Sequence, residues 1–220
     1  MNKHFSRRNF LNGGLTAAAS LTFPTLFPQP ATAQDVAPEE SLFVVGPLKG
    51  YTPQIGTLVS MLNYNRDTII RSVKNMTMAQ LDFLFDANAN TIGGLLLHLA
   101  AVDKFYQINT FEGRQDFNEE EKKEWGAAME LGDAGRKEIK GREVSYYLNK
   151  LAAVREQTLA ELKKKNDKWL LAVDPVRTKQ MKQSINTYWK WFHVCEHESN
   201  HRGQISWLKS RLPGAKPAKD

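Results

Sequence analysis

Apolar residues recur every three or four positions in four separate stretches of the chain. That spacing places them on one face of an α-helix, so each stretch predicts an amphipathic helix. No alternating pattern typical of β-strands competes with it, and four long helices predict an all-α four-helix bundle. The predicted helices run from Pro53 to about Met76, from Thr91 to about Glu112, from about Glu143 to Lys165 and from about Ser184 to Arg211.

The segments between these helices differ in length. Residues 77–90 are polar, with one helical turn expected at Thr77. Residues 113–142 form a connector of 30 residues, in which Asn118 is expected to cap a short acidic helix. A connector of this length is unlike a tight helical hairpin. We therefore expect it to cross the length of the bundle between the second and third long helices.

Three of the five histidines, His193, His197 and His201, lie at four-residue intervals in the last predicted helix. Each residue turns an α-helix by about 100°, so side chains four residues apart point within about 40° of one another. Imidazoles at this spacing can reach one metal ion. His98 lies in the apolar face of the second predicted helix, where a lone histidine is more often a hydrogen-bonded core residue. Together the four predict a metal site, with core histidines in a plain bundle as the alternative.

The chemistry of the candidate site follows from its nitrogen donors, which suit divalent zinc, nickel, iron or copper. Gln204 faces the same way as the histidines on the helical wheel. It is a candidate to orient a bound water, or else a polar residue at the edge of the core. Cys195 lies about 160° from His197 and is expected to be a packing residue. The sequence assigns no catalytic residue.

The first 33 residues contain the parts of an export signal. Arg7 and Arg8 precede a moderately apolar stretch over residues 13–27, and Ala31-Thr32-Ala33 is a cleavage site of the A-x-A type. The apolar stretch is too short for a stable membrane span. We therefore predict twin-arginine export to the periplasm or the extracellular space, with an uncleaved anchor as the alternative. The expected mature chain consists of a linker or arm over residues 34–50, the bundle over 51–212 and a flexible tail over 213–220.

The net charge of the chain is less basic than it first looks. Lys and Arg number 30 against 24 Asp and Glu, a formal charge of +6. The expected signal holds three of the basic residues and no acidic one, which leaves 27 against 24, or +3. No basic stripe with interleaved aromatic residues is present, which argues against a nucleic-acid partner. A single cysteine excludes an intramolecular disulfide.

Two segments carry a family resemblance. They are TIGGLLLHLAAVDKFY, which begins at Thr91, and WKWFHVCEHESNHRGQISWLKSRLPG, which begins at Trp189. Together they resemble the DinB-like family of metal-binding four-helix proteins, whose fold mycothiol-dependent maleylpyruvate isomerases and bacillithiol transferases share. The resemblance covers roughly Thr52 to Gly214. It implies a DinB-like four-helix bundle with a long crossover between helices two and three.

The resemblance also implies which residues bind the metal. The three histidine ligands of the family match His98, His197 and His201, which leaves His193 to line the pocket or to support the ligands. The family further implies homodimers. Because Trp191 and Phe192 point largely away from His197 on the wheel, we expect this aromatic face in or beside the dimer interface.

The expected activity is less specific than the expected site. We predict an exported metal-dependent hydrolase acting on a small molecule of unknown identity. One alternative is a non-catalytic metal-binding or stress-related protein. Another is a thiol-dependent transferase, against which export weighs because the low-molecular-weight thiols of the family are expected inside the cell.

Overall fold

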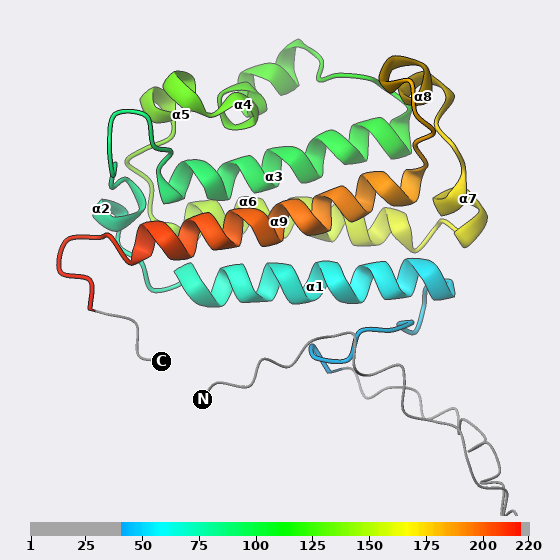
Figure 1. Cartoon of the computed structure of the whole chain (residues 1–220), viewed down its shortest axis with the longest axis horizontal. Helices are drawn as coiled ribbons and strands as arrows, with labels where there is room; N and C mark the ends of the chain where they lie inside the picture. The colour runs from blue at the N-terminus through cyan, green and yellow to red at the C-terminus, as the bar shows by residue number, and fades with distance from the viewer. Residues whose placement is uncertain (1–40, 217–220) are drawn as a thin grey trace, which may run out of the picture. The chain divides into compact units, whose positions relative to one another are not determined.

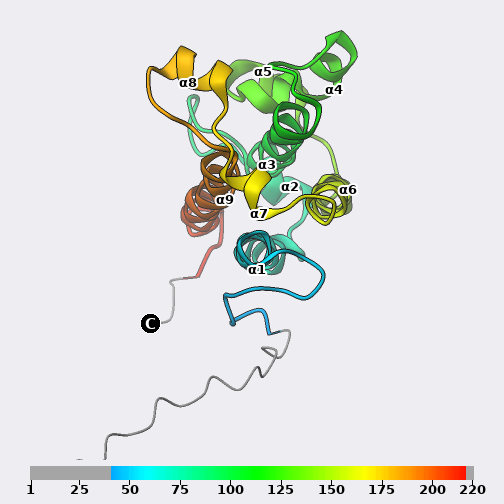
Figure 2. The same ribbon diagram turned by 90° about the vertical axis from the view of Figure 1, so that its right-hand side faces the viewer.

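The computed structural model describes residues 41–216, whose core is a bundle of four long helices lying side by side (Figures 1 and 2). Contacts join α1 to α9, α9 to α3, α3 to α6 and α6 to α1, so the four helices enclose one core. The predicted all-α, DinB-like bundle is confirmed. The long helices are α1 (Pro53–Val73), α3 (Ile92–Gln107), α6 (Val144–Leu162) and α9 (Thr187–Lys209).

The starts of the long helices follow from their capping residues. Pro53 takes the first helical position of α1, as the sequence predicts. Thr52 precedes it but makes no capping bond, because its hydroxyl donates to Asp167 instead. The Thr91 hydroxyl accepts a hydrogen bond from the Gly94 amide (3.0 Å) and begins α3. Helix α9 starts at Thr187, three residues later than Ser184, because Asn186 caps it by accepting from the Trp189 amide (2.8 Å).

Shorter helices occupy the connections. The turn predicted at Thr77 is α2, and the acidic helix predicted after Asn118 is α4; each begins with a capping box. Three further short helices were not predicted, because five to seven residues are too few to show a period. The short helices are α2 (Met78–Leu81), α4 (Glu119–Glu130), α5 (Gly132–Glu138), α7 (Asp167–Leu171) and α8 (Pro175–Met181).

The long connector crosses the bundle beside α3, as Figure 1 shows for α4 and α5. Phe117, Trp125 and Ile139 are buried and fix the connector to the core. Helix α3 extends as far as predicted, but its last turn is the π-helix η2 (Ile108–Glu112). It ends where Gly113 takes a positive φ of 73°, a conformation that favours glycine.

Trp191 corrects the expected dimer surface. Its side chain is fully buried within the chain, where its ring stacks on Phe111 (centroids 5.4 Å apart) and lies beside Tyr106. Trp191 therefore cannot contact a second chain, and that part of the expectation is wrong. Phe192 is 48% exposed. Homodimerisation itself stays a prediction.

Several expectations fall at the chain ends. The export signal over residues 1–33, the first part of the linker (34–40) and the last tail residues (217–220) lie outside the described residues. The described part of the linker, residues 41–50, contains no helix. Within residues 41–216, no helix has both the length and the hydrophobicity needed to cross a membrane.

Candidate metal centre

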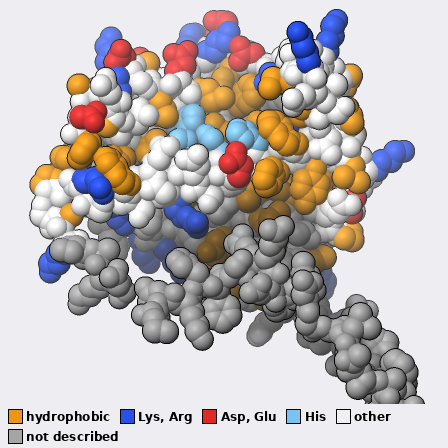
Figure 3. All heavy atoms as spheres, in the orientation of Figure 1, with side chains coloured by type: hydrophobic (Ala, Val, Ile, Leu, Met, Phe, Trp, Pro, Cys, Tyr) orange, Lys and Arg blue, Asp and Glu red, His pale blue; other side chains and the backbone are white. Residues whose placement is uncertain are grey.

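Three of the predicted site residues meet at one point of the bundle. His98 projects from α3, and His197 and His201 project from successive turns of α9. The Nε2 atom of His197 lies 3.2 Å from Nε2 of His98 and 3.0 Å from Nε2 of His201. Histidine side chains reach the surface in the middle of the face drawn in Figure 3, with apolar side chains to either side.

The outer nitrogens of two of these rings are held by hydrogen bonds. The Nδ1–H of His98 donates to the carbonyl of Ala128 on α4 (2.9 Å), so the crossover orients this ring. The Nδ1–H of His201 donates to Oε1 of Gln204 (3.0 Å). Because carbonyl and amide oxygens only accept, both rings keep Nδ1 protonated and turn the Nε2 lone pair inward.

The three inward nitrogens cannot satisfy one another. His98 and His201 both present lone pairs to His197, and a single proton on its Nε2 serves only one of the two contacts. Nδ1 of His197 is buried without a hydrogen-bond partner among the described residues. A tetrahedral ion with Zn–N bonds of about 2.0–2.1 Å separates its ligand nitrogens by roughly 3.3 Å, close to the two distances found here. The cluster therefore fits a divalent metal.

Burial prepares the same rings for coordination. It lowers the pKa of His98 and of His201, although hydrogen bonds to Ala128 and Gln204 act in the opposite direction. For His197, burial and then the neighbouring imidazoles of His201 and His98 lower the pKa to about 3. The rings are thus neutral near pH 7, and only a neutral imidazole coordinates a metal.

His193 lies outside the group of three. Its ring stacks parallel to Trp189 (centroids 5.4 Å apart), and its Nδ1 is 2.8 Å from Oε1 of Glu196. The ring centre is 5.6 Å from that of His197, so His193 stands at the rim of the cluster. Cys195 is buried away from it, against Asn65. The roles of all these residues at a bound metal stay predictions.

A second polar cluster in the bundle was not predicted. Each long helix contributes one buried charged residue to this cluster: Arg66 from α1, Asp103 from α3, Arg155 from α6 and Glu198 from α9. Arg155 bridges Asp103 (3.0 Å) and Glu198 (2.7 Å), and Arg66 contacts the same two carboxylates. The available signal was charged residues among the apolar positions of all four helices, but spacing within one helix does not reveal partners on another.

Pockets open on both sides of the histidines along α9. One of about 490 Å³ is lined by Gln204, which bonds to His201. The other, of about 180 Å³, is lined by Tyr106 and Trp189, whose rings flank His193. Of the two, only the pocket beside Gln204 has the volume typical of a small-molecule site.

Comparison with known proteins agrees with this geometry. The family model for mycothiol-S-transferases matches residues 57–214, a range that contains all three clustered histidines. A crystal structure of a conserved protein from Enterococcus faecalis shares the fold, with a TM-score of 0.52 and 12% identity over 70% of this chain and 93% of that one. No curated protein matches the sequence. The chain belongs to the mycothiol-S-transferase family, which is DinB-like.

Proposed function

We propose that this protein is a metal-dependent S-transferase, which joins a low-molecular-weight thiol to an electrophilic small molecule. His98, His197 and His201 hold the ion through Nε2. The convergence of these three neutral nitrogens carries the proposal, and the family match supports the choice of a thiol as substrate.

The charge of the ligand set favours an anionic partner. Three neutral imidazoles leave a divalent ion with its full charge, and a bound divalent ion lowers the pKa of a coordinated thiol or water. The buried carboxylates of Asp103 and Glu198 do not offset this charge, because they already pair with arginines of the bundle. A soft sulfur anion is a preferred ligand of zinc and similar ions.

The chain itself supplies orientation and a proton acceptor. Ala128 and Gln204 hold two of the three rings at Nδ1, which keeps each Nε2 directed at the ion. His193 is the candidate to accept the thiol proton. When its Nδ1–H donates to Glu196, its Nε2 is free, and the ring is half-buried at the rim of the cluster.

Four other expectations remain proposals of lower rank. Hydrolysis and non-catalytic metal binding use the same histidines, but no contact in the site favours either over thiol transfer. Twin-arginine export rests on Arg7, Arg8, the apolar stretch over residues 13–27 and the A-x-A site. A homodimer now rests on the exposed Phe192 and on the resemblance to dimeric relatives.

The test compares metal-loaded with chelator-treated protein. Zinc-, nickel- and iron-loaded samples are each given mycothiol, bacillithiol, glutathione or cysteine, with monochlorobimane as the electrophile. We expect thioether formation with at least one thiol, at least about tenfold faster than with chelated protein, and its loss in His197→Ala. Hydrolysis of 4-nitrophenyl acetate without any thioether would favour the hydrolase. Stoichiometric metal with neither activity would leave a metal-binding protein.

A further inference from the structure

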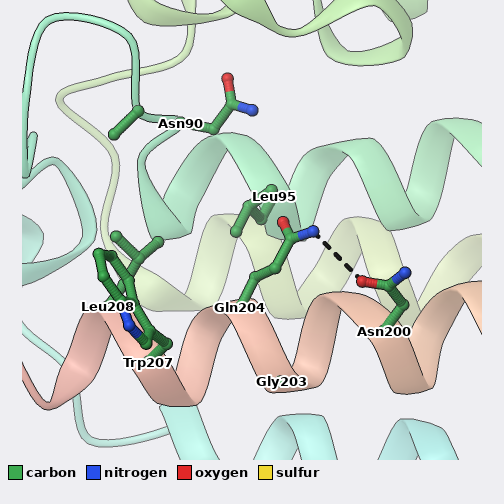
Figure 4. Close-up of a pocket in the computed structure, with 8 residues that line it drawn as sticks. Asn90, Leu95, Asn200, Gly203, Gln204, Trp207 and Leu208 are labelled. Atoms are coloured by element: carbon green, nitrogen blue, oxygen red, sulfur yellow. Dashed lines mark hydrogen bonds between the residues drawn. The ribbon is translucent and has the colours of Figure 1, made fainter.

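The larger pocket lies at the C-terminal end of the histidine row on α9 (Figure 4). Its apolar surface comes from Leu95, Trp207 and Leu208, and amide side chains add polar groups. Its volume of about 490 Å³ lies within the range of small-molecule sites. The lining residues are Ala89, Asn90, Leu95, Asn200, Gly203, Gln204, Trp207 and Leu208.

This pocket shares a wall with the histidine cluster. Oε1 of Gln204 accepts from His201, and its Nε2 donates to Oδ1 of Asn200 (3.2 Å), the bond dashed in Figure 4. On the other wall, Leu95 lies one turn before His98 on α3. A molecule in the pocket is therefore one side chain away from the candidate metal ligands.

Trp207 gives the pocket an open aromatic surface. The indole is 44% exposed, and Phe85, itself 43% exposed, meets it edge-to-face at 4.9 Å. The Arg211 guanidinium lies over the indole at 4.1 Å and holds it in place. Large aromatic side chains left this exposed beside a pocket are typical of a surface that binds an apolar ligand.

The charges of the two pockets differ. The smaller pocket, at the Trp189 end of α9, includes Arg177 and Lys190 in its lining. The described residues that line the larger pocket include no charged side chain. A charged ligand there would lose hydration without gaining an ionic partner among the lining residues, whereas a neutral apolar ring would not.

We infer that the larger pocket binds the electrophilic substrate, and that this substrate is an uncharged, flat, apolar molecule of about the size of a substituted benzene. The inference rests on the proposed S-transferase function. In the reaction, the thiol sulfur forms a bond to a ring carbon and the bond from that carbon to its leaving group breaks. The leaving group departs as an anion, and the thiol proton passes to a base or to solvent.

Binding is measured separately from turnover, with probes that carry no leaving group. Isothermal titration of the metal-loaded protein compares neutral 1,3-dinitrobenzene with anionic 3,5-dinitrobenzoate. We expect the neutral probe to bind at least about tenfold more tightly, because only the anion buries a charge without a partner. Equal affinity, or no binding of the neutral probe, would overturn the inference.

Gly203 offers a way to fill the pocket without disturbing the helix. A Cβ built at Gly203 meets nothing within 4 Å, so Gly203→Leu places its side chain at the pocket without a backbone clash. Gly126 on α4 is the matched control, since its Cβ also meets nothing and it lines a different pocket. Trp207→Ala removes the aromatic wall at an exposed position.

We expect Gly203→Leu and Trp207→Ala each to weaken 1,3-dinitrobenzene binding at least about fivefold, with unchanged metal content, and Gly126→Leu to bind as the unmodified protein does. If thiol transfer is absent but this binding pattern holds, the S-transferase proposal fails and the pocket assignment stands. If thiol transfer to 1-chloro-2,4-dinitrobenzene occurs with KM unchanged in both pocket variants, the pocket assignment fails and the S-transferase proposal stands.

Discussion

Two polar clusters lie inside the same bundle and share helix α9, yet only one of them balances its charges within the chain. Even there, Oε2 of Glu198 is buried without a hydrogen-bond partner among the described residues. Glu198 faces two buried arginines. Arg66 and Arg155 each form ion pairs with Glu198 and also with Asp103. His197, one residue earlier, faces two further imidazoles whose lone pairs it cannot satisfy. The charges neutralise each other within the chain, whereas the histidines leave converging lone pairs that are placed to accept a cation.

This difference assigns different tasks to the two clusters. A buried ion pair contributes little net stability against an apolar substitute, but losing one partner leaves a costly unpaired charge. The charge cluster is thus suited to fixing how the four helices pack. The packing in turn sets where α9 presents its histidines to His98. The histidine cluster instead leaves lone pairs unsatisfied, and we propose that a bound metal ion satisfies them.

The largest effect is expected from breaking the charge cluster. Arg155→Met leaves Asp103 and Glu198 with one guanidinium between them, and we expect a loss of about 3–5 kcal/mol in the free energy of unfolding. Urea denaturation of the metal-free protein measures it. Replacing all four charged residues by apolar ones of similar volume should cost far less, since no charge is then left unpaired. A loss below about 1 kcal/mol in Arg155→Met would mean that the cluster is not a unit.

Removing one of the clustered histidines should lower metal affinity strongly and the stability of the metal-free protein only slightly. His98→Ala, His197→Ala and His201→Ala should each weaken metal binding by more than about 100-fold, beyond the range typical of supporting residues. The metal-free variants should keep most of their stability, because no charge is stranded. His193→Ala is the matched control and should retain one ion per chain. Wild-type affinity in His98→Ala would show that the site does not span α3 and α9.

Gln204 should give an intermediate effect on the histidine cluster alone. Gln204→Leu removes the acceptor of the His201 Nδ1–H bond, and we expect metal affinity to fall about 10–100-fold. Asn200→Ala is its control, because Asn200 contacts Gln204 but no ring of the cluster. Competition with a chromophoric chelator measures both. Equal losses of metal affinity in the two variants would show that the hydrogen bond from His201 to Gln204 is not the cause.

Acid should separate the two clusters through their different pKa values. The unfolded chain protonates His197 below about pH 6.5, but the folded metal-free protein does so only near its pKa of about 3. The contribution of neutral His197 to the free energy of unfolding is therefore fully present above pH 6.5 and is lost as pH falls toward 3.

Asp103 of the charge cluster should not contribute to this change. Although burial opposes ionisation, the Arg155 and Arg66 guanidiniums hold the pKa of Asp103 below its ordinary value, so it stays ionised above pH 4.5. Urea midpoints from pH 7 to 4.5 should fall less steeply in His197→Gln than in the unmodified protein. Parallel slopes would show that His197 is not shielded in the folded chain.

The contrast between the clusters also explains what the sequence predicts. The helix start at Thr91 and the cap at Asn118 depend on bonds between neighbouring residues, and the start at Pro53 depends on the fixed φ of proline, so all three are predicted correctly. The spacing of His197 and His201 is equally local. The partnership with His98 crosses between helices, so spacing does not show it; the place of His98 in an apolar face and the family resemblance pointed to it.

The partners of Glu198 and the burial of Trp191 were not predicted for the same reason: both depend on contacts between helices. The partners of Glu198 lie on three other helices, and nothing in the spacing along α9 identifies them. Trp191 does point away from the histidines, as the helical wheel predicts. The error was to equate that direction with solvent, since α9 also packs against α1 and α7, and Phe111 covers the indole.

The most direct test of the account is X-ray absorption spectroscopy at the metal edge of zinc-reconstituted protein. The account predicts one ion per chain with three imidazole nitrogens at about 2.0–2.1 Å, and a loss of one of them in His98→Ala under saturating zinc. His193→Ala should leave the spectrum unchanged. A spectrum with fewer than three imidazoles in the unmodified protein, or one that His98→Ala does not alter, would contradict the claim that these histidines form a single metal centre.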